Sequence, residues 1–177
     1  EARSIRYEIF TNFCKKNNIK TILTAHNLED QVETFFIRLS RGSGLRGLSA
    51  MSQITKINSQ LILYRPLLNT KKKFLIKISK KTFGKYFKDP SNKNKKFMRS
   101  KIRNLKIPLE KSGIKYDKIF KSIQNLSLSN RTLQEYQKKI FKKLIKKTKR
   151  EVVIKYKKYQ ALSNDTKIAL INESIKR

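Results

Sequence analysis

The chain has 177 residues, of which 38% are hydrophobic, and its 44 Lys and Arg against 12 Asp and Glu give a formal net charge of +32. This length and apolar content suffice to bury a core and exclude a wholly disordered chain, so we expect one domain with part of a second. A single cysteine, Cys14, excludes an internal disulfide and any paired-cysteine metal or redox centre.

The positive charge predicts a polyanionic partner, and nucleic acid is the natural one because each neutralised phosphate releases counterions. Lys, Asn and Ile are abundant together, as in proteins encoded by AT-rich genomes, and this bias is an alternative explanation that can hold at the same time. There is no signal peptide and no apolar run long enough for a membrane span, so we expect a cytoplasmic protein without a membrane partner. The chain opens without Met, and we expect a fragment.

The first elements alternate between helix and strand. Apolar residues recur at helical spacing over residues 1–18, where Cys14 is expected in the core, and residues 21–25 form a β-branched run typical of a buried strand. His26 follows this strand, and ligands bind at the carboxyl ends of strands in open α/β sheets.

Residues 26–51 combine a helix start with a glycine-bearing basic loop. Asn27 is a candidate N-cap, and His26 and Asp30 lie one helical turn apart and can face the same space. Arg41, Gly42, Ser43 and Gly44 follow the helix. On spacing alone, a capping arrangement and a simple turn explain these residues better than a phosphate site does.

Residues 44–51 are expected to form a loop, residues 60–64 a strand, and a helix begins near Lys71. This order predicts an α/β fold with part of a doubly wound parallel sheet. From Lys71 to Arg103 there are 14 Lys and Arg and one acid, Asp89, interleaved with aromatic residues. Such a stripe is typical of an RNA surface, although a solvated face beside core aromatics is the alternative.

The last part is predicted to be mainly helical. A helix is expected from about residue 94 to 105, stopping before Pro108, and one or two long helices over 114–148, with 127–130 as a candidate break. A short strand is expected at 151–154, and a last helix capped by Ser163, Asn164 and Asp165.

Several motifs in order resemble the tRNA(Ile)-lysidine synthase family of N-type ATP pyrophosphatases, the PP-loop enzymes. These motifs are Ala2-Arg3-Ser4-Ile5-Arg6-Tyr7, Thr24-Ala25-His26, Asp30-Gln31, Glu33-Thr34, Arg38-Leu39, Arg41-Gly42-Ser43-Gly44-Leu45, Gly47-Leu48, Arg65-Pro66-Leu67, Asp89-Pro90-Ser91-Asn92, and Arg99 to Arg103 before Pro108. Five ordered groups of motifs over about the first hundred residues are more specific than any one of them.

The resemblance implies ATP-dependent ligation of L-lysine to C2 of the wobble cytidine of tRNA(Ile) with a CAU anticodon, through an adenylated tRNA. It implies ATP and ATP-associated Mg²⁺ as cofactors, no resident metal site, and is compatible with a homodimer. It also implies a division into residues 1–110, the carboxyl-terminal part of the PP-loop domain; 111–150, a basic helical linker; and 151–177, the start of a tRNA-recognition domain.

The same resemblance suggests site roles. Asp30 would hold the lysine ammonium or help to deprotonate it, Glu33 would assist or brace the helix, His26 would contact a phosphate or the base, and Arg6 would supply charge. ATP or phosphate binding is assigned to Arg41, Gly42, Ser43, Gly44, Arg99 and Arg103, and tRNA binding to Arg99, Arg103, Lys95 and Lys96.

The sequence departs from the family pattern in one respect, because it contains no Ser-Gly-Gly-x-Asp-Ser phosphate loop. The family places this loop upstream of residue 1, so we expect this fragment alone to be inactive. Three other functions stay open. Another PP-loop tRNA modifier, such as a thiolation enzyme, is disfavoured by the single cysteine. A non-catalytic basic RNA-binding remnant gives no reason for the clustered motifs, and the basic excess disfavours an amidotransferase-type enzyme for small molecules.

Overall fold

The computed structural model describes residues 2–87, 98–148 and 151–175, which divide into two compact units, Glu1–Ser127 and Leu128–Arg177. The first unit contains α1 (Ala2–Lys16), β1 (Thr21–Leu23), α2 (Leu28–Leu39), α3 (Leu45–Leu48), β2 (Ile54–Lys56), β3 (Ile62–Tyr64), α4 (Lys72–Phe83), α5 (Met98–Asn104) and α6 (Lys106–Lys111). Helix α7 (Tyr116–Leu144) contributes residues to both units. The second unit adds β4 (Ile145–Lys147), β5 (Val152–Ile154), α8 (Tyr156–Gln160) and α9 (Asn164–Ile175).

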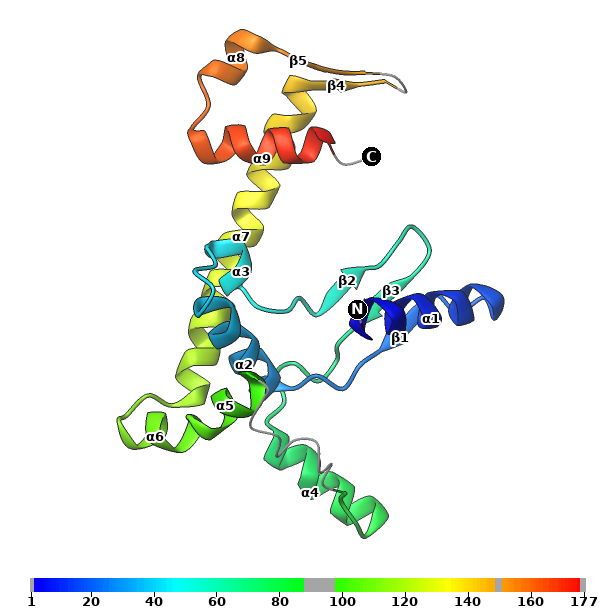
Figure 1. Cartoon of the computed structure of the whole chain (residues 1–177), viewed down its shortest axis with the longest axis vertical. Coiled ribbons are helices and arrows are strands. Elements are labelled where there is room, and N and C mark those ends of the chain that lie inside the picture. The colour runs from blue at the N-terminus through cyan, green and yellow to red at the C-terminus, as the bar shows by residue number, and fades with distance from the viewer. Residues whose placement is uncertain (1, 88–97, 149–150, 176–177) are drawn as a thin grey trace. The chain divides into compact units, whose positions relative to one another are not determined.

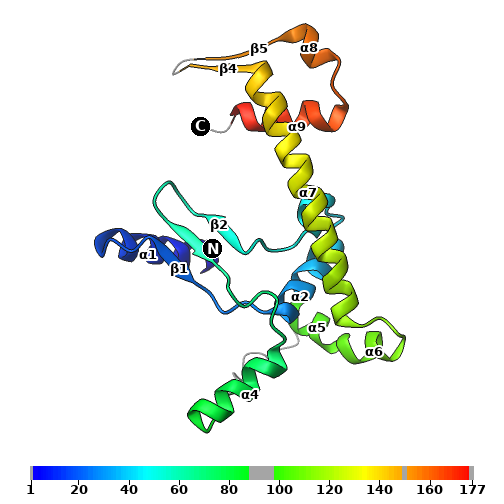
Figure 2. The same cartoon turned by 180° about the vertical axis from the view of Figure 1, so that it is seen from behind.

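The sheet of the first unit has the order β1-β3-β2. Figures 1 and 2 show this region from opposite sides. Strands β1 and β3 are parallel, whereas β2 pairs with β3 in the antiparallel direction. The α/β class and the parallel pair are confirmed. The antiparallel strand β2 was not predicted, because its three residues are all exposed and show no alternation.

Strand β1 is less buried than its β-branched sequence suggests. Only Ile22 is partly covered, and Leu23 is 65% exposed, because β1 lies at the edge of the described sheet and pairs on one side only. The prediction of a buried strand is therefore wrong for this structure. Leu61 and Leu63, by contrast, are buried in and beside the central strand β3.

The main core of the first unit lies between α2 and α7. Leu28, Val32, Ala50, Tyr116, Phe120 and Ile123 form one buried cluster. The face of α2 that carries Leu28 and Val32 is thus the face that packs inward. Phe35 and Phe36 cover the same cluster, with their rings 5.6 Å apart in an edge-to-face arrangement.

Several predicted boundaries shift. The expected loop at 44–51 contains helix α3. The stop predicted before Pro108 is confirmed, since α5 ends at Asn104. Pro108 lies in the first turn of the separate helix α6, where a missing N–H costs little. Helix α7 continues through residues 127–130 without a break, but ends at Leu144, so residues 145–147 form β4 instead of more helix. Strand β4 pairs with the predicted strand β5.

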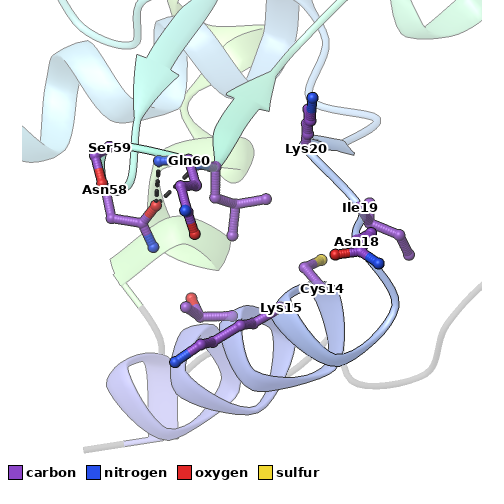
Figure 3. A pocket seen from close by; sticks show the side chains of 10 residues that line it. Cys14, Lys15, Asn18, Ile19, Lys20, Asn58, Ser59 and Gln60 are labelled. Atoms are coloured by element: carbon purple, nitrogen blue, oxygen red, sulfur yellow. Dashed lines mark hydrogen bonds between the residues drawn. The ribbon is translucent and has the colours of Figure 1, made fainter.

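A pocket of about 450 Å³ lies at the amino ends of β1 and β3, beside α1 (Figure 3). Cys14 lines it and is buried, as expected for a core thiol. The Asn58 side chain shapes the turn before β3, because its Oδ1 accepts hydrogen bonds from the N–H groups of Gln60 at 2.9 Å and Leu61 at 2.8 Å. This pocket is at the end of the parallel strands away from His26.

Candidate functional site

The candidate site begins where the parallel strands end. After β1, the Thr24 N–H donates to the Tyr64 carbonyl at 3.0 Å, so pairing with β3 extends one residue past the end of β1. The chain then turns through His26 into α2. The Nδ1 atom of His26 lies 2.9 Å from Thr24 Oγ1, which fixes the imidazole beside the strand end. The position agrees with the rule that open α/β sheets bind ligands at the carboxyl ends of their strands.

Asn27 and Asp30 form a capping box at the start of α2. The Asn27 side chain accepts from the Asp30 N–H at 3.2 Å, and the Asp30 carboxylate accepts from the Asn27 N–H at 3.0 Å. The capping interpretation is therefore correct. It uses Oδ2 of Asp30, while Oδ1 faces Arg103 at 3.8 Å from its Nη2 atom. One carboxylate thus serves both the helix start and the charged cluster.

Glu33 and Arg103 form the strongest contact of the site. Arg103 donates to Glu33 from Nε at 2.6 Å and from Nη2 at 3.1 Å, a two-pronged ion pair between α2 and α5. Glu33 is 3% exposed, and Arg99 adds a longer contact of 3.8 Å. Burial raises the pKa of Glu33, and the hydrogen bond and charge of Arg103 oppose that rise. The hydrogen bond to Glu33 raises the pKa of Arg103.

Glu29 extends the cluster to two further elements. Its Oε2 accepts from the Lys72 N–H at 2.8 Å, which caps the start of α4, and its Oε1 lies 3.7 Å from the Lys106 ammonium on α6. Glu29 is an acid in the first turn of α2 and was not among the predicted site residues. No local signal reveals its contact with a residue 43 positions away.

The glycine-bearing loop lies at the other end of α2. This helix has 12 residues, so the loop and Asp30 are separated by roughly 15 Å at 1.5 Å of rise per residue. The structure therefore does not bring Arg41, Gly42, Ser43 and Gly44 together with His26 and Asp30. Gly42 has φ +65°, as a tight turn requires.

Arg38 holds this loop, a role that sequence reasoning did not identify. Its Nη1 donates to the carbonyls of Gly47 and Ala50, both at 2.7 Å. Gln31 adds a reciprocal pair with the Met51 backbone, at 2.7 Å and 2.8 Å. A Cβ at Gly47 would lie 2.5 Å from Ser43 Cβ, so the loop closes tightly only with glycine there.

The remaining predicted residues fall in three places. Arg6 is exposed on α1, and within the described ranges no hydrogen bond or ion pair joins it to the cluster. Arg99 and Arg103 both lie against Glu33. Lys95 and Lys96, like the Asp89-Pro90-Ser91-Asn92 motif, lie outside the described residues.

The chain is similar in sequence to a known domain family and to several named enzymes. Residues 1–110 match the PP-loop domain family. The tRNA(Ile)-lysidine synthase of Wolbachia pipientis wMel is 35% identical over 141 residues, which are 80% of this chain and 32% of the relative. The enzymes of the same name from Orientia tsutsugamushi (strain Boryong) and Haemophilus ducreyi are each 41% identical, over 59% and 61% of this chain and 23% and 24% of their own lengths.

The chain thus spans about a third or less of the length of these relatives. The matches confirm the expected similarity to tRNA(Ile)-lysidine synthases. Because the family match covers more than half of the 177 residues, the chain belongs to the PP-loop domain family.

Proposed function

We propose that this chain carries part of the active site of an enzyme that ligates L-lysine to C2 of the wobble cytidine in tRNA(Ile) with a CAU anticodon. ATP would activate the C2 carbonyl as an adenylate, and the lysine ε-amine would then displace AMP. The observation that carries the proposal is the pair of carboxylates Asp30 and Glu33 that share Arg103 beside the carboxyl ends of β1 and β3. Relatives named tRNA(Ile)-lysidine synthase support it.

Asp30 is the proposed group for the amine. One of its oxygens is 3.8 Å from Arg103 and is not used by the helix cap, so it is placed to hold an ammonium or take a proton from it. His26, fixed by Thr24 at the same strand end, is the proposed contact for a phosphate or the target base.

Glu33 fits a bracing role better than an acid–base role. Both of its oxygens are occupied by Arg103, so its charge is neutralised and it ties α5 to α2. Arg99 is 41% exposed, and we propose that it and Arg103 present positive charge to ATP or RNA phosphate.

For three more groups the proposal rests on the similarity. Arg6 and the Arg41–Gly44 loop would act on ATP or phosphate, and Lys95 and Lys96 would contact tRNA. Within the ranges described, no three His, Cys, Asp or Glu side chains are grouped to hold a metal ion. We propose, from the similarity, that Mg²⁺ arrives with ATP.

Residues 111–150 are proposed as a basic connection, and 151–177 as part of a tRNA-recognition region. In the part of the chain that the structure describes, no helix has the length and apolarity to cross a bilayer. A cytoplasmic location and a homodimer stay as proposals.

The test is incorporation of labelled lysine into an unmodified tRNA(Ile) transcript by the full-length product of the gene that encodes this chain. ATP-dependent incorporation is expected with the CAU anticodon and none when the wobble cytidine is replaced by uridine. No incorporation into either transcript, with ATP present and the protein folded, would reject the proposal.

A further inference from the structure

A small cavity of about 270 Å³ lies between α2, α4, α5, α6 and the first turn of α7. Its polar lining consists of Glu29, Glu33, Lys72, Lys73, Arg103, Lys106 and Tyr116. Tyr116 is 5% exposed, and among the described residues its hydroxyl has no hydrogen-bond partner. A buried hydroxyl without a partner is costly and calls for an explanation in terms of what the cavity holds.

The carboxylates of the cavity are already engaged. Both oxygens of Glu33 accept from Arg103, one oxygen of Glu29 accepts from the Lys72 N–H, and the other lies 3.7 Å from Lys106. Among the described residues, no acceptor therefore reaches the Tyr116 hydroxyl. Burial raises the pKa of Tyr116 to about 12, so at neutral pH the phenol keeps its proton and can donate it.

The charges around the hydroxyl favour an anion. Four cationic side chains line the cavity against two carboxylates. Lys72 and Lys73 have no ion-pair partner in the described part of the chain, and the Lys106 ammonium lies 5.0 Å from the centre of the Tyr116 ring. The excess of positive charge next to an unsatisfied donor matches a ligand oxygen that carries negative charge.

We propose that the Tyr116 hydroxyl, with Lys72, Lys73 and Lys106, binds an oxyanion, and that this oxyanion is a backbone phosphate of the RNA substrate. The identification of this oxyanion as an RNA phosphate rests on the proposed function. It is favoured because Lys72 and Lys73 in the first turn of α4 line the cavity, and the exposed Lys77, Lys80 and Lys81 continue the positive charge along that helix. Its volume is also just below the range of about 300–1,000 Å³ typical of pockets that enclose a whole small molecule.

The first test uses inorganic phosphate as the probe and the full-length protein. Phosphate should raise the Tm of the wild type and of Lys77→Gln, which lies on α4 outside the cavity, but not that of Tyr116→Phe or Lys73→Gln. Without phosphate, Tyr116→Phe should keep or slightly raise the Tm, because it removes an unsatisfied hydroxyl and retains the ring. A Tm several degrees lower for Tyr116→Phe would show a structural role and overturn the proposal.

The second test distinguishes an RNA phosphate from pyrophosphate or ATP as the oxyanion that binds in the cavity. Tyr116→Phe should bind the tRNA transcript about tenfold more weakly, the loss expected for a hydrogen bond to a charged group. Lys73→Gln should reduce the slope of log K against log salt by about 0.7–0.9, the contribution of one phosphate. Binding of pyrophosphate and ATP should not change.

Weakened pyrophosphate or ATP binding with unchanged tRNA binding would overturn the RNA source. Unchanged binding of every ligand would overturn the site itself. The proposed function is tested separately, because it fails when the wild type binds and modifies no tRNA, whereas this inference fails when the wild type binds tRNA and Tyr116→Phe binds equally well.

Discussion

At the scale of single residues, the Glu33–Arg103 pair decides how the charged cluster holds together. Glu33 is buried, and its charge is stabilised chiefly by Arg103, which donates two hydrogen bonds to it, with a longer contact from Arg99. Replacing Arg103 by Gln should leave a buried charge poorly paired and cost about 2–4 kcal/mol in the free energy of unfolding. Urea denaturation measures this, and Arg131→Gln, at an exposed position of α7, is the control.

The same pair predicts a pH dependence with a definite sign. The folded-state pKa of Glu33 is raised above its ordinary value of 4.5. The cost of its buried charge is therefore absent below that ordinary value, and it appears as the pH rises through the folded pKa. The destabilisation caused by Arg103→Gln should be larger at pH 7 than at pH 5. An equal loss of stability at both pH values would show that Arg103 does not act through the charge of Glu33.

At the scale of elements, the loop after α2 is built around Gly47. Gly47→Ala should displace the turn at Ser43 and loosen the carbonyls that Arg38 binds, at a cost of about 1–3 kcal/mol. Gly44→Ala is the matched control, because φ there is −77° and no atom lies within 4 Å of its Cβ position. Similar unfolding curves for both variants would contradict the close approach of Gly47 to Ser43.

Helix α4 is anchored at its start by a side chain from α2. Glu29→Ala removes the acceptor of the Lys72 N–H, so amide hydrogen exchange in the first turn of α4 should accelerate. Glu8→Ala, at an exposed position of α1, should leave exchange in α4 unchanged. Unchanged exchange in Glu29→Ala would mean that α4 is held by other contacts.

The sequence predicted those parts of the fold that follow from local periodicity. Helices α1, α2, α4 and α9, the strands β1, β3 and β5, and the Asn27 cap were all expected from spacing and capping residues. The strands β2 and β4 were missed because neither contains a run of apolar residues, so each is defined by pairing with its partner strand.

The sequence predicted only the part of the site whose residues are close together along the chain. His26, Asp30 and Glu33 share one local motif, whereas Arg103 is 70 positions from Glu33 in the chain, and Lys72 is 43 positions from Glu29. The burial of the Tyr116 hydroxyl has no counterpart in spacing at all. Such contacts depend on how α2, α4, α5 and α7 pack.

At the scale of the whole molecule, the net charge of +32 predicts how RNA binding responds to salt. If the lysines contact phosphates, raising the salt from about 50 mM to 200 mM should weaken tRNA binding by about 10³–10⁵-fold, as for proteins that make six to ten phosphate contacts. Filter binding of a tRNA transcript at several salt concentrations measures the slope. A nearly flat dependence would favour compositional bias as the origin of the charge.

The most direct measurement is labelled-lysine incorporation into unmodified tRNA by full-length Asp30→Asn. Asparagine retains an oxygen that can accept from the Asn27 N–H, so the start of α2 should persist while the negative charge is lost. We predict that incorporation falls by about 10²-fold or more, whereas tRNA affinity changes by less than about twofold. Near-normal incorporation by this variant would remove Asp30 from the reaction and contradict the assignment of the site.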